Sequence, residues 1–86
     1  MNFIWTNRFE KAYRALSEDR QEAVDEHLGL LSKNWRHPSL RTKKLEGTRD
    51  IWSLRVSRDI RLTFEVLKEG ILLRNVGYHD DTFSSP

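Results

Sequence analysis

The sequence contains no cysteine, only two prolines and no long apolar run. Without cysteine there is no disulfide, and three scattered histidines do not make a structural zinc site. No segment approaches the ~18 apolar residues of a membrane span. The start, MNFIWTNRFEK, lacks the basic and then apolar regions of a signal peptide. We therefore expect a cytoplasmic protein with no membrane contact, no metal and no small-molecule cofactor.

The length of 86 residues allows one small domain. A core of this size is marginal, so the three Trp, four Phe and two Tyr must supply much of its apolar burial. We predict one domain over residues 1–83 and a disordered tail over residues 84–86.

The net charge of +2 is unevenly distributed. Residues 36–61 carry eight basic and three acidic side chains, which gives +5, whereas the preceding and following segments carry −1 and −2. Such a segment suits the phosphates of a nucleic acid, although ordinary solvated surface is the alternative. The basic residues are Arg36, Arg41, Lys43, Lys44, Arg49, Arg55, Arg58 and Arg61.

Two helices are expected in the first third of the chain. Thr6 or Asn7 is suited to cap the first, and Ser17 the second, because their side-chain oxygens accept from free backbone N–H groups. The second helix must end before Pro38, since the residue before proline avoids helical backbone. The apolar stripes, at helical spacing, are Phe9, Ala12, Tyr13 and Leu16, then Ala23, Val24, His27, Leu28, Leu31 and Trp35.

Four strands are expected. Residues 2–5 form a short apolar and aromatic run. Residues 51–57 and 60–67 alternate apolar and polar side chains around a tight turn at Ser57-Arg58-Asp59. Residues 71–76 are almost continuously apolar, which is typical of a well-covered strand.

These elements predict an α+β fold with the order β-α-α-β-β-β. The last three strands form an antiparallel meander, the first strand joins the same antiparallel sheet, and the two N-terminal helices pack on one face. Residues 36–49 are expected to connect the second helix to the sheet as a basic loop.

The polar side of the predicted sheet is the main functional signal. We call the side chains that alternate away from the helices the polar face; they are Ser53, Arg55, Arg61, Thr63 and Glu65. Arg55 and Arg61 flank the tight turn and point the same way, so a phosphate between them would relieve their repulsion and accept two hydrogen bonds from each. Alternatively, Glu65 and Asp59 neutralise them as surface ion pairs.

His79 and Phe83 follow the last strand. An imidazole exchanges protons near neutral pH, so His79 is a candidate general acid or base, although an exposed loop histidine is the alternative. Phe83 is suited to stack on an unstacked base, or it closes the edge of the core. The chain has no phosphate-binding glycine loop, nucleophile elbow or paired metal ligands, so any RNA cleavage would use the ribose 2′-OH and arginines without a metal.

From Trp5 to Phe83 the chain resembles the RelE/ParE superfamily of type II toxin–antitoxin toxins. The segments that carry the resemblance are Lys44-Leu45-Glu46-Gly47, Asp50-Ile51-Trp52-Ser53-Leu54-Arg55-Val56, Asp59-Ile60-Arg61-Leu62-Thr63-Phe64-Glu65-Val66 and Val76-Gly77-Tyr78-His79-Asp80-Asp81. The resemblance implies a ribosome-dependent mRNA endonuclease that a cognate antitoxin neutralises.

The resemblance also implies roles for single residues. Arg61 and Arg55 match functional basic positions of the family, His79 matches the catalytic histidine of the YoeB-like and YafQ-like branches, and Phe83 matches an aromatic residue of the YafQ-like branch. We therefore take Arg61, His79 and Arg55 as catalytic candidates. The RNA-binding candidates are Lys43, Lys44, Arg49, Arg58 and Phe83.

The chain departs from RelE itself, which uses two lysines where Ser53 and Arg55 stand, an arginine near His79 and a tyrosine near Phe83. A phenylalanine cannot exchange protons, so the general base is unassigned, with His79 as its candidate and Lys43 or Lys44 as modulators of charge. Two alternatives follow: a ParE-like toxin that inhibits gyrase, and a non-catalytic member that binds only its antitoxin or DNA.

Overall fold

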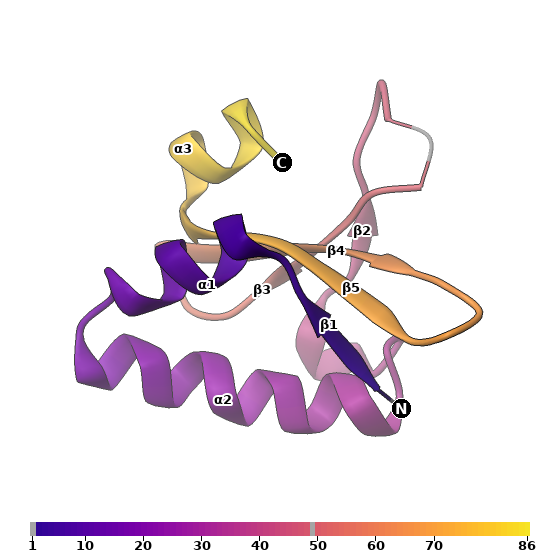
Figure 1. Cartoon of the computed structure of the whole chain (residues 1–86), viewed down its shortest axis with the longest axis horizontal. Helices are drawn as coiled ribbons and strands as arrows, with labels where there is room; N and C mark the ends of the chain where they lie inside the picture. Colours follow the sequence, from indigo (N-terminus) through magenta and orange to yellow (C-terminus); the bar gives the residue numbers. More distant parts are fainter. Residues whose placement is uncertain (1, 49) are drawn as a thin grey trace.

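A computed structural model describes residues 2–48 and 50–86. The structure has one sheet with helices on both of its faces (Figure 1). The strands are β1 (Phe3–Trp5), β2 (Lys43–Lys44), β3 (Trp52–Arg55), β4 (Ile60–Val66) and β5 (Ile71–Tyr78). The helices are α1 (Asn7–Arg14), α2 (Glu18–Lys33), a 3-10 turn η1 (Pro38–Leu40) and α3 (His79–Ser84).

The two N-terminal helices begin at the caps that the sequence predicts. The Thr6 hydroxyl accepts from the backbone N–H of Phe9 at 3.1 Å, and the Ser17 hydroxyl accepts from the N–H of Arg20 at 3.4 Å. Each cap satisfies one of the N–H groups that the first helical turn leaves without a partner. The helix α2 ends at Lys33, well before Pro38.

The sheet has the order β1-β5-β4-β3-β2. The meander β3-β4-β5 is antiparallel, as predicted, but β1 pairs with β5 in parallel, with Phe3 opposite Ile71. The sheet is therefore mixed rather than antiparallel throughout. The reason is that α1 and α2 intervene between β1 and the meander, so β1 is free to join the far edge of β5 in either direction.

The two faces of the sheet separate by side-chain alternation. Figure 1 shows α2 beneath the sheet and α3 above it. The core lies between the sheet and the layer of α1 and α2. Four of the positions predicted for the helical stripes are buried in it, and five more are partly buried and pack against it, namely Ala12, Tyr13, Leu16, Ala23 and Trp35. The buried apolar residues are Phe9, Val24, Leu28, Leu31, Leu40, Leu54, Val56, Ile60, Leu62, Phe64, Ile71, Leu73 and Val76.

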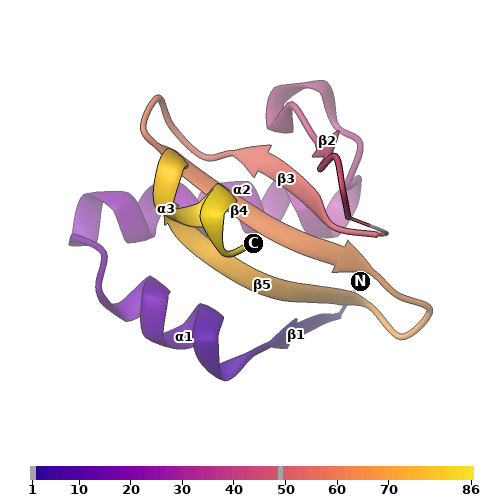
Figure 2. The same ribbon diagram turned by 90° about the horizontal axis from the view of Figure 1, so that it is seen from above.

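Two short elements lie where the sequence predicted loop. Lys43–Lys44 form the edge strand β2, paired antiparallel with β3, inside the predicted basic loop. His79–Ser84 form α3, which returns over β4 and β5 on the polar side of the sheet (Figure 2). Neither has enough apolar residues to produce a periodic signal, so tertiary contacts decide both.

The last residues, for which the sequence predicted a tail over 84–86, contact the sheet in the structure. Ser84 closes α3, and the next two residues lie against the sheet. The carbonyl oxygen of Pro86 accepts from the Thr63 hydroxyl and from Nε of Arg74, both at 3.1 Å, while that of Ser85 accepts from the Asn75 amide at 2.8 Å. A register shift after Thr63 makes this possible, because it turns both Arg74 and Asn75 towards these carbonyls.

No helix within the described residues is long and apolar enough to cross a membrane.

Gly77 allows α3 to lie close to β5, because a Cβ at that position would stand 3.2 Å from the Thr82 hydroxyl. The packing of α3 on the strand thus depends on a residue without a side chain.

Gly70→Ala is expected to destabilise the protein. Gly70 has a φ of 154°, and an added Cβ would collide with the carbonyl oxygen of Asn2, which accepts from the N–H of Ile71 where β1 joins β5. A non-glycine residue in this backbone region costs roughly 1–3 kcal/mol. Equilibrium urea unfolding measures the change.

Gly29→Ala is the matched control. Gly29 lies on the exposed side of α2 with no atom within 4 Å of an added Cβ, so alanine should stabilise the fold by about 0.4–1 kcal/mol. Equal effects of the two substitutions would contradict the assigned contact between Gly70 and Asn2.

Candidate functional site

The strand register places two arginines directly opposite each other. Arg55 at the end of β3 pairs with Arg61 near the start of β4, and the next pair on the same face is Ser53 with Thr63. Directly opposed residues on one face have Cβ atoms about 4.5–5.5 Å apart. We call Arg55 and Arg61 the arginine pair. The structure thus brings together the two basic candidates that the sequence singled out.

The guanidinium of Arg61 is held at the turn between β3 and β4. Its Nη1 donates to the carbonyl oxygens of Ser57, Ile60 and Arg58 at 2.8, 3.2 and 3.3 Å. Burial, and then the charge of Arg55, lowers the pKa of Arg61. Among the described residues its Nε and Nη2 donate to no other group, so this edge remains for a bidentate contact with an anion.

The carboxylates that could have neutralised the arginine pair are engaged elsewhere. Asp59 Oδ2 lies 3.1 Å from Nη2 of Arg20, and Glu65 Oε1 lies 2.6 Å from Nη1 of Arg74. Within residues 2–48 and 50–86 neither member of the arginine pair takes part in an ion pair. Among the described residues, no carboxylate therefore lies within ion-pair distance of the arginine pair, although the charge of Asp59 still acts on Arg61 and partly opposes the effect of Arg55 on its pKa.

His79 lies at the same end of the sheet as the arginine pair. It is the first residue of α3, directly after Gly77 and Tyr78, and Gly77 is the cross-strand partner of Arg61. Its backbone N–H donates to the carbonyl oxygen of Asp59 at 3.2 Å, which fixes the start of α3 to the β3–β4 turn. The side chain is 51% exposed, so the imidazole remains accessible.

Two neighbours orient the imidazole of His79. Its Nδ1 lies 3.2 Å from Oδ1 of Asp80, and its ring meets the ring of Phe83 edge-on at a centroid distance of 4.4 Å. Histidine and phenylalanine four residues apart share one face of α3. Phe83 is half-buried, and its ring lies beside that of His79.

The remaining basic candidates divide by position. Lys43 pairs with Ser53 and therefore shares the side of the polar face, whereas Lys44 pairs with Trp52 and points to the opposite side. Arg58 is exposed in the turn beside Arg61. Arg49 lies outside the described residues. The structure thus places Lys43 and Arg58 where they can add positive charge around the arginine pair, and it separates Lys44 from them.

Only part of the polar face is open. Ser53 and Thr63 are 5% and 0% exposed, because the C-terminal segment and the neighbouring strands cover them. The arginine pair lies beyond this cover and stays half-exposed. The accessible site is therefore the end of the sheet at the β3–β4 turn, and not the whole polar face.

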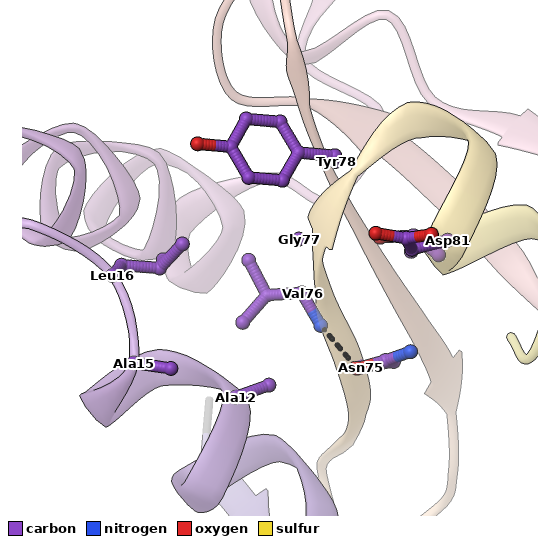
Figure 3. A pocket seen from close by; sticks show the side chains of 9 residues that line it. Ala12, Ala15, Leu16, Asn75, Val76, Gly77, Tyr78 and Asp81 are labelled. Atoms are coloured by element: carbon purple, nitrogen blue, oxygen red, sulfur yellow. Dashed lines mark hydrogen bonds between the residues drawn. The ribbon is translucent and has the colours of Figure 1, made fainter.

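A separate cavity of about 230 Å³ lies on the other side of β5, between α1 and α3. Ala12 and Leu16 of α1 and Val76 of β5 form its apolar wall, and Asp81 stands at its α3 side (Figure 3). The hydroxyl of Thr82, which also lines it, is buried without a hydrogen-bond partner among the described residues. Because it contains neither the arginine pair nor His79, this cavity is not the candidate site.

The arrangement offers two chemical functions at one end of the sheet. Two opposed guanidiniums can bind a phosphate and stabilise extra negative charge on it. An accessible imidazole can transfer a proton at neutral pH. Within the described residues no group of three or more His, Cys, Asp or Glu side chains is placed to hold a metal ion.

Comparisons with known proteins match this chain by structure alone. No protein-family model matches it, and no curated protein matches it by sequence. A YoeB/ParE toxin from Agrobacterium tumefaciens superposes with a TM-score of 0.80 at 18% identity, covering 92% of this chain and 99% of that chain. The YafQ protein of E. coli gives 0.80 at 13% identity, with 95% and 97% covered.

The toxin in the E. coli RelBE toxin–antitoxin complex gives a TM-score of 0.72 at 22% identity, covering 90% of this chain and 94% of that chain. The chain has the fold of the RelE-like toxins. This agreement confirms the fold class expected from the resemblance, including a largely antiparallel sheet with two N-terminal helices. The identities are too low to assign residues, so the site is argued from its own geometry.

Two residues near the site were missed from the sequence. Arg74 binds Glu65 and the C-terminal segment, and Arg20 binds Asp59 in the β3–β4 turn. Periodicity could not identify either of them, since Arg74 lies at a register shift and Arg20 is separated from Asp59 by 39 positions. The acidic pair Asp80-Asp81, which favours a helix N-terminus, was the available signal for α3.

Sulfate is expected to stabilise the protein through the arginine pair. An anion that binds only the folded state, at about ten times its Kd, adds about 1.4 kcal/mol and raises Tm by several degrees. Arg55→Gln and Arg61→Gln should each remove most of this rise. Thermal unfolding in sulfate and chloride at equal ionic strength measures it.

Arg14→Gln provides the control, because Arg14 is an exposed arginine paired with Glu10 on α1 and lies away from the site. It should leave the response to sulfate unchanged. A response that survives in both Arg55→Gln and Arg61→Gln would show that sulfate binds elsewhere.

Proposed function

We propose that this protein is the toxin of a toxin–antitoxin module and that it cleaves mRNA within the ribosome. The observation that carries the proposal is the arginine pair, opposed across two strands and outside every ion pair of the described residues, beside an accessible imidazole at the same end of the sheet. The RelE-like fold supports the same reading, because the neighbouring structures are toxins of such modules.

The reaction needs side chains that bind the scissile phosphate, and it includes two proton transfers. The ribose 2′-OH attacks the adjacent phosphorus, the O2′–P bond forms, and the bond from phosphorus to the 5′ oxygen of the next nucleotide breaks. One proton leaves the 2′-OH and one reaches the departing oxygen. The arginine pair would bind the phosphate and stabilise the charge that builds up on it, and His79 would carry out one of the two transfers.

Phe83 and the neighbouring basic side chains would hold the substrate around this centre. The half-buried ring of Phe83, beside His79, would stack on a base, and such stacking contributes about 1–3 kcal/mol in single-stranded complexes. Lys43 and Arg58 flank the arginine pair and would contact the RNA backbone. Lys44 lies on the other side of β2, so it contributes to the overall positive field only.

A cognate antitoxin is the expected protein partner. Neighbouring structures include the RelBE, YoeB–YefM and DinJ–YafQ complexes, each of a toxin with its antitoxin. A partner with acidic side chains would complement residues 36–61, whose net charge is +5. Binding there would cover the arginine pair and stop access of RNA.

His79→Ala is expected to lower mRNA cleavage on programmed ribosomes by about 10²–10⁴-fold, the usual contribution of a general acid or base. Arg61→Ala should lower it as well, because the phosphate loses a preorganised bidentate ligand. Cleavage sites and rates are read by primer extension from purified protein without antitoxin.

His27→Ala is the matched control. His27 is half-buried on α2, where Nδ1 lies 2.7 Å from the carbonyl oxygen of Ala23, away from the site. It should cleave as fast as the wild type. Equal rates for the wild type and His79→Ala would exclude the catalytic role of His79. Inhibition of gyrase supercoiling without RNA cleavage would replace the proposal by a ParE-like activity.

A further inference from the structure

An arginine on the helical side of the molecule reaches the candidate site. Arg20, in the first turn of α2, directs Nη2 to Oδ2 of Asp59 at 3.1 Å, and its guanidinium lies 5.5 Å from the centroid of the Tyr78 ring. Thirty-nine positions separate Arg20 from Asp59. This contact is the ion pair that ties α2 to the β3–β4 turn.

Asp59 joins three elements at one residue. Its Oδ2 accepts from Arg20, its Oδ1 accepts from the Ser57 hydroxyl at 2.9 Å, and its backbone carbonyl accepts from the N–H of His79 at 3.2 Å. The same residue therefore fixes the turn to α2 and fixes the start of α3 to the turn.

The β3–β4 turn also holds Arg61, one of the catalytic candidates. The carbonyl oxygens of Ser57 and Arg58 accept from Nη1 of Arg61 at 2.8 and 3.3 Å. Any displacement of Asp59 would therefore move the acceptors of the Arg61 guanidinium and the anchor of His79 together.

We propose that Arg20 is a positioning residue for RNA cleavage: by holding Asp59, it sets the position of Arg61 relative to His79. The inference rests on the proposed function, and it adds a residue from α2 to a site otherwise built from the sheet and α3. The contacts of the Arg20 guanidinium among the described residues are with Ser17, Asp59 and Tyr78, so it acts on Arg61 and His79 through Asp59.

Because the ion pair between Arg20 and Asp59 is partly exposed, we expect it to affect the rate of cleavage much more than the stability of the fold. Both side chains are partly exposed, at 38% and 49%, and exposed pairs contribute little to the stability of a fold. Catalysis is far more sensitive to position, since a displacement of about 1 Å can lower a rate about 10²-fold. The hydrogen bonds from Arg20 and then from Ser57 lower the pKa of Asp59, so the carboxylate is ionised at neutral pH.

The test is a double-mutant cycle with Arg20→Gln and Asp59→Asn in steady-state cleavage on programmed ribosomes. Each substitution should lower kcat about ten- to a hundred-fold and leave KM nearly unchanged, because phosphate binding groups remain. The double mutant should be no slower than the slower single mutant, since both changes break one link. Arg20→Lys, which keeps the charge, should restore part of the rate.

Arg14→Gln is the control, because it removes an exposed arginine–carboxylate pair of 2.7 Å on α1 that does not touch the turn. It should cleave as the wild type does. Wild-type kcat in Arg20→Gln, or a loss confined to KM, would overturn the positioning role.

Amide hydrogen exchange of His79 tests the same link without cleavage. Its N–H should exchange faster in Arg20→Gln than in the wild type or in Arg14→Gln, because its acceptor on Asp59 is no longer held. Unchanged exchange overturns the inference. If exchange responds while the wild type does not cut mRNA, the link from Arg20 to His79 is supported and the proposed function is what fails.

Discussion

The register between β3 and β4 determines which side chains share each face of the sheet. With Arg55 opposite Arg61, every apolar position of both strands turns to α1 and α2, and every polar position turns away. A slip of one residue would turn one strand over, so that its apolar side chains would leave the core and its arginine would enter it. The tight turn at residues 57–59 fixes this register, so the core and the candidate site depend on the same three residues.

The position of the site follows from how the two ends of the chain close around that sheet. β1 covers one edge of β5, while α3 and the C-terminal segment cover the polar sides of β4 and β5. What stays accessible is the end at the β3–β4 turn, where two positive charges meet. Their mutual repulsion opposes folding and favours binding of an anion, which is the balance expected of a binding site rather than of a structural contact.

Much of the fold could be predicted because it rests on local patterns. The caps at Thr6 and Ser17, the helical stripes and the alternation of residues 51–67 all express short-range geometry. The parallel direction of β1, the strand β2 and the helix α3 could not be predicted, because each has few residues and is stabilised by partners far away in the chain. The contacts of Ser85 and Pro86 with the sheet also join residues far apart in the chain.

The sequence by itself determined the two-faced sheet, its helical cover and the shared direction of Arg55 and Arg61, since side-chain alternation with period two requires no distant contact. Tertiary structure decided what surrounds that pair. It assigned Asp59 to Arg20 and Glu65 to Arg74, joined His79 to the turn and separated Lys43 from Lys44. The physical reason is that partners of charged groups are set by distances across elements, which no spacing along the chain encodes.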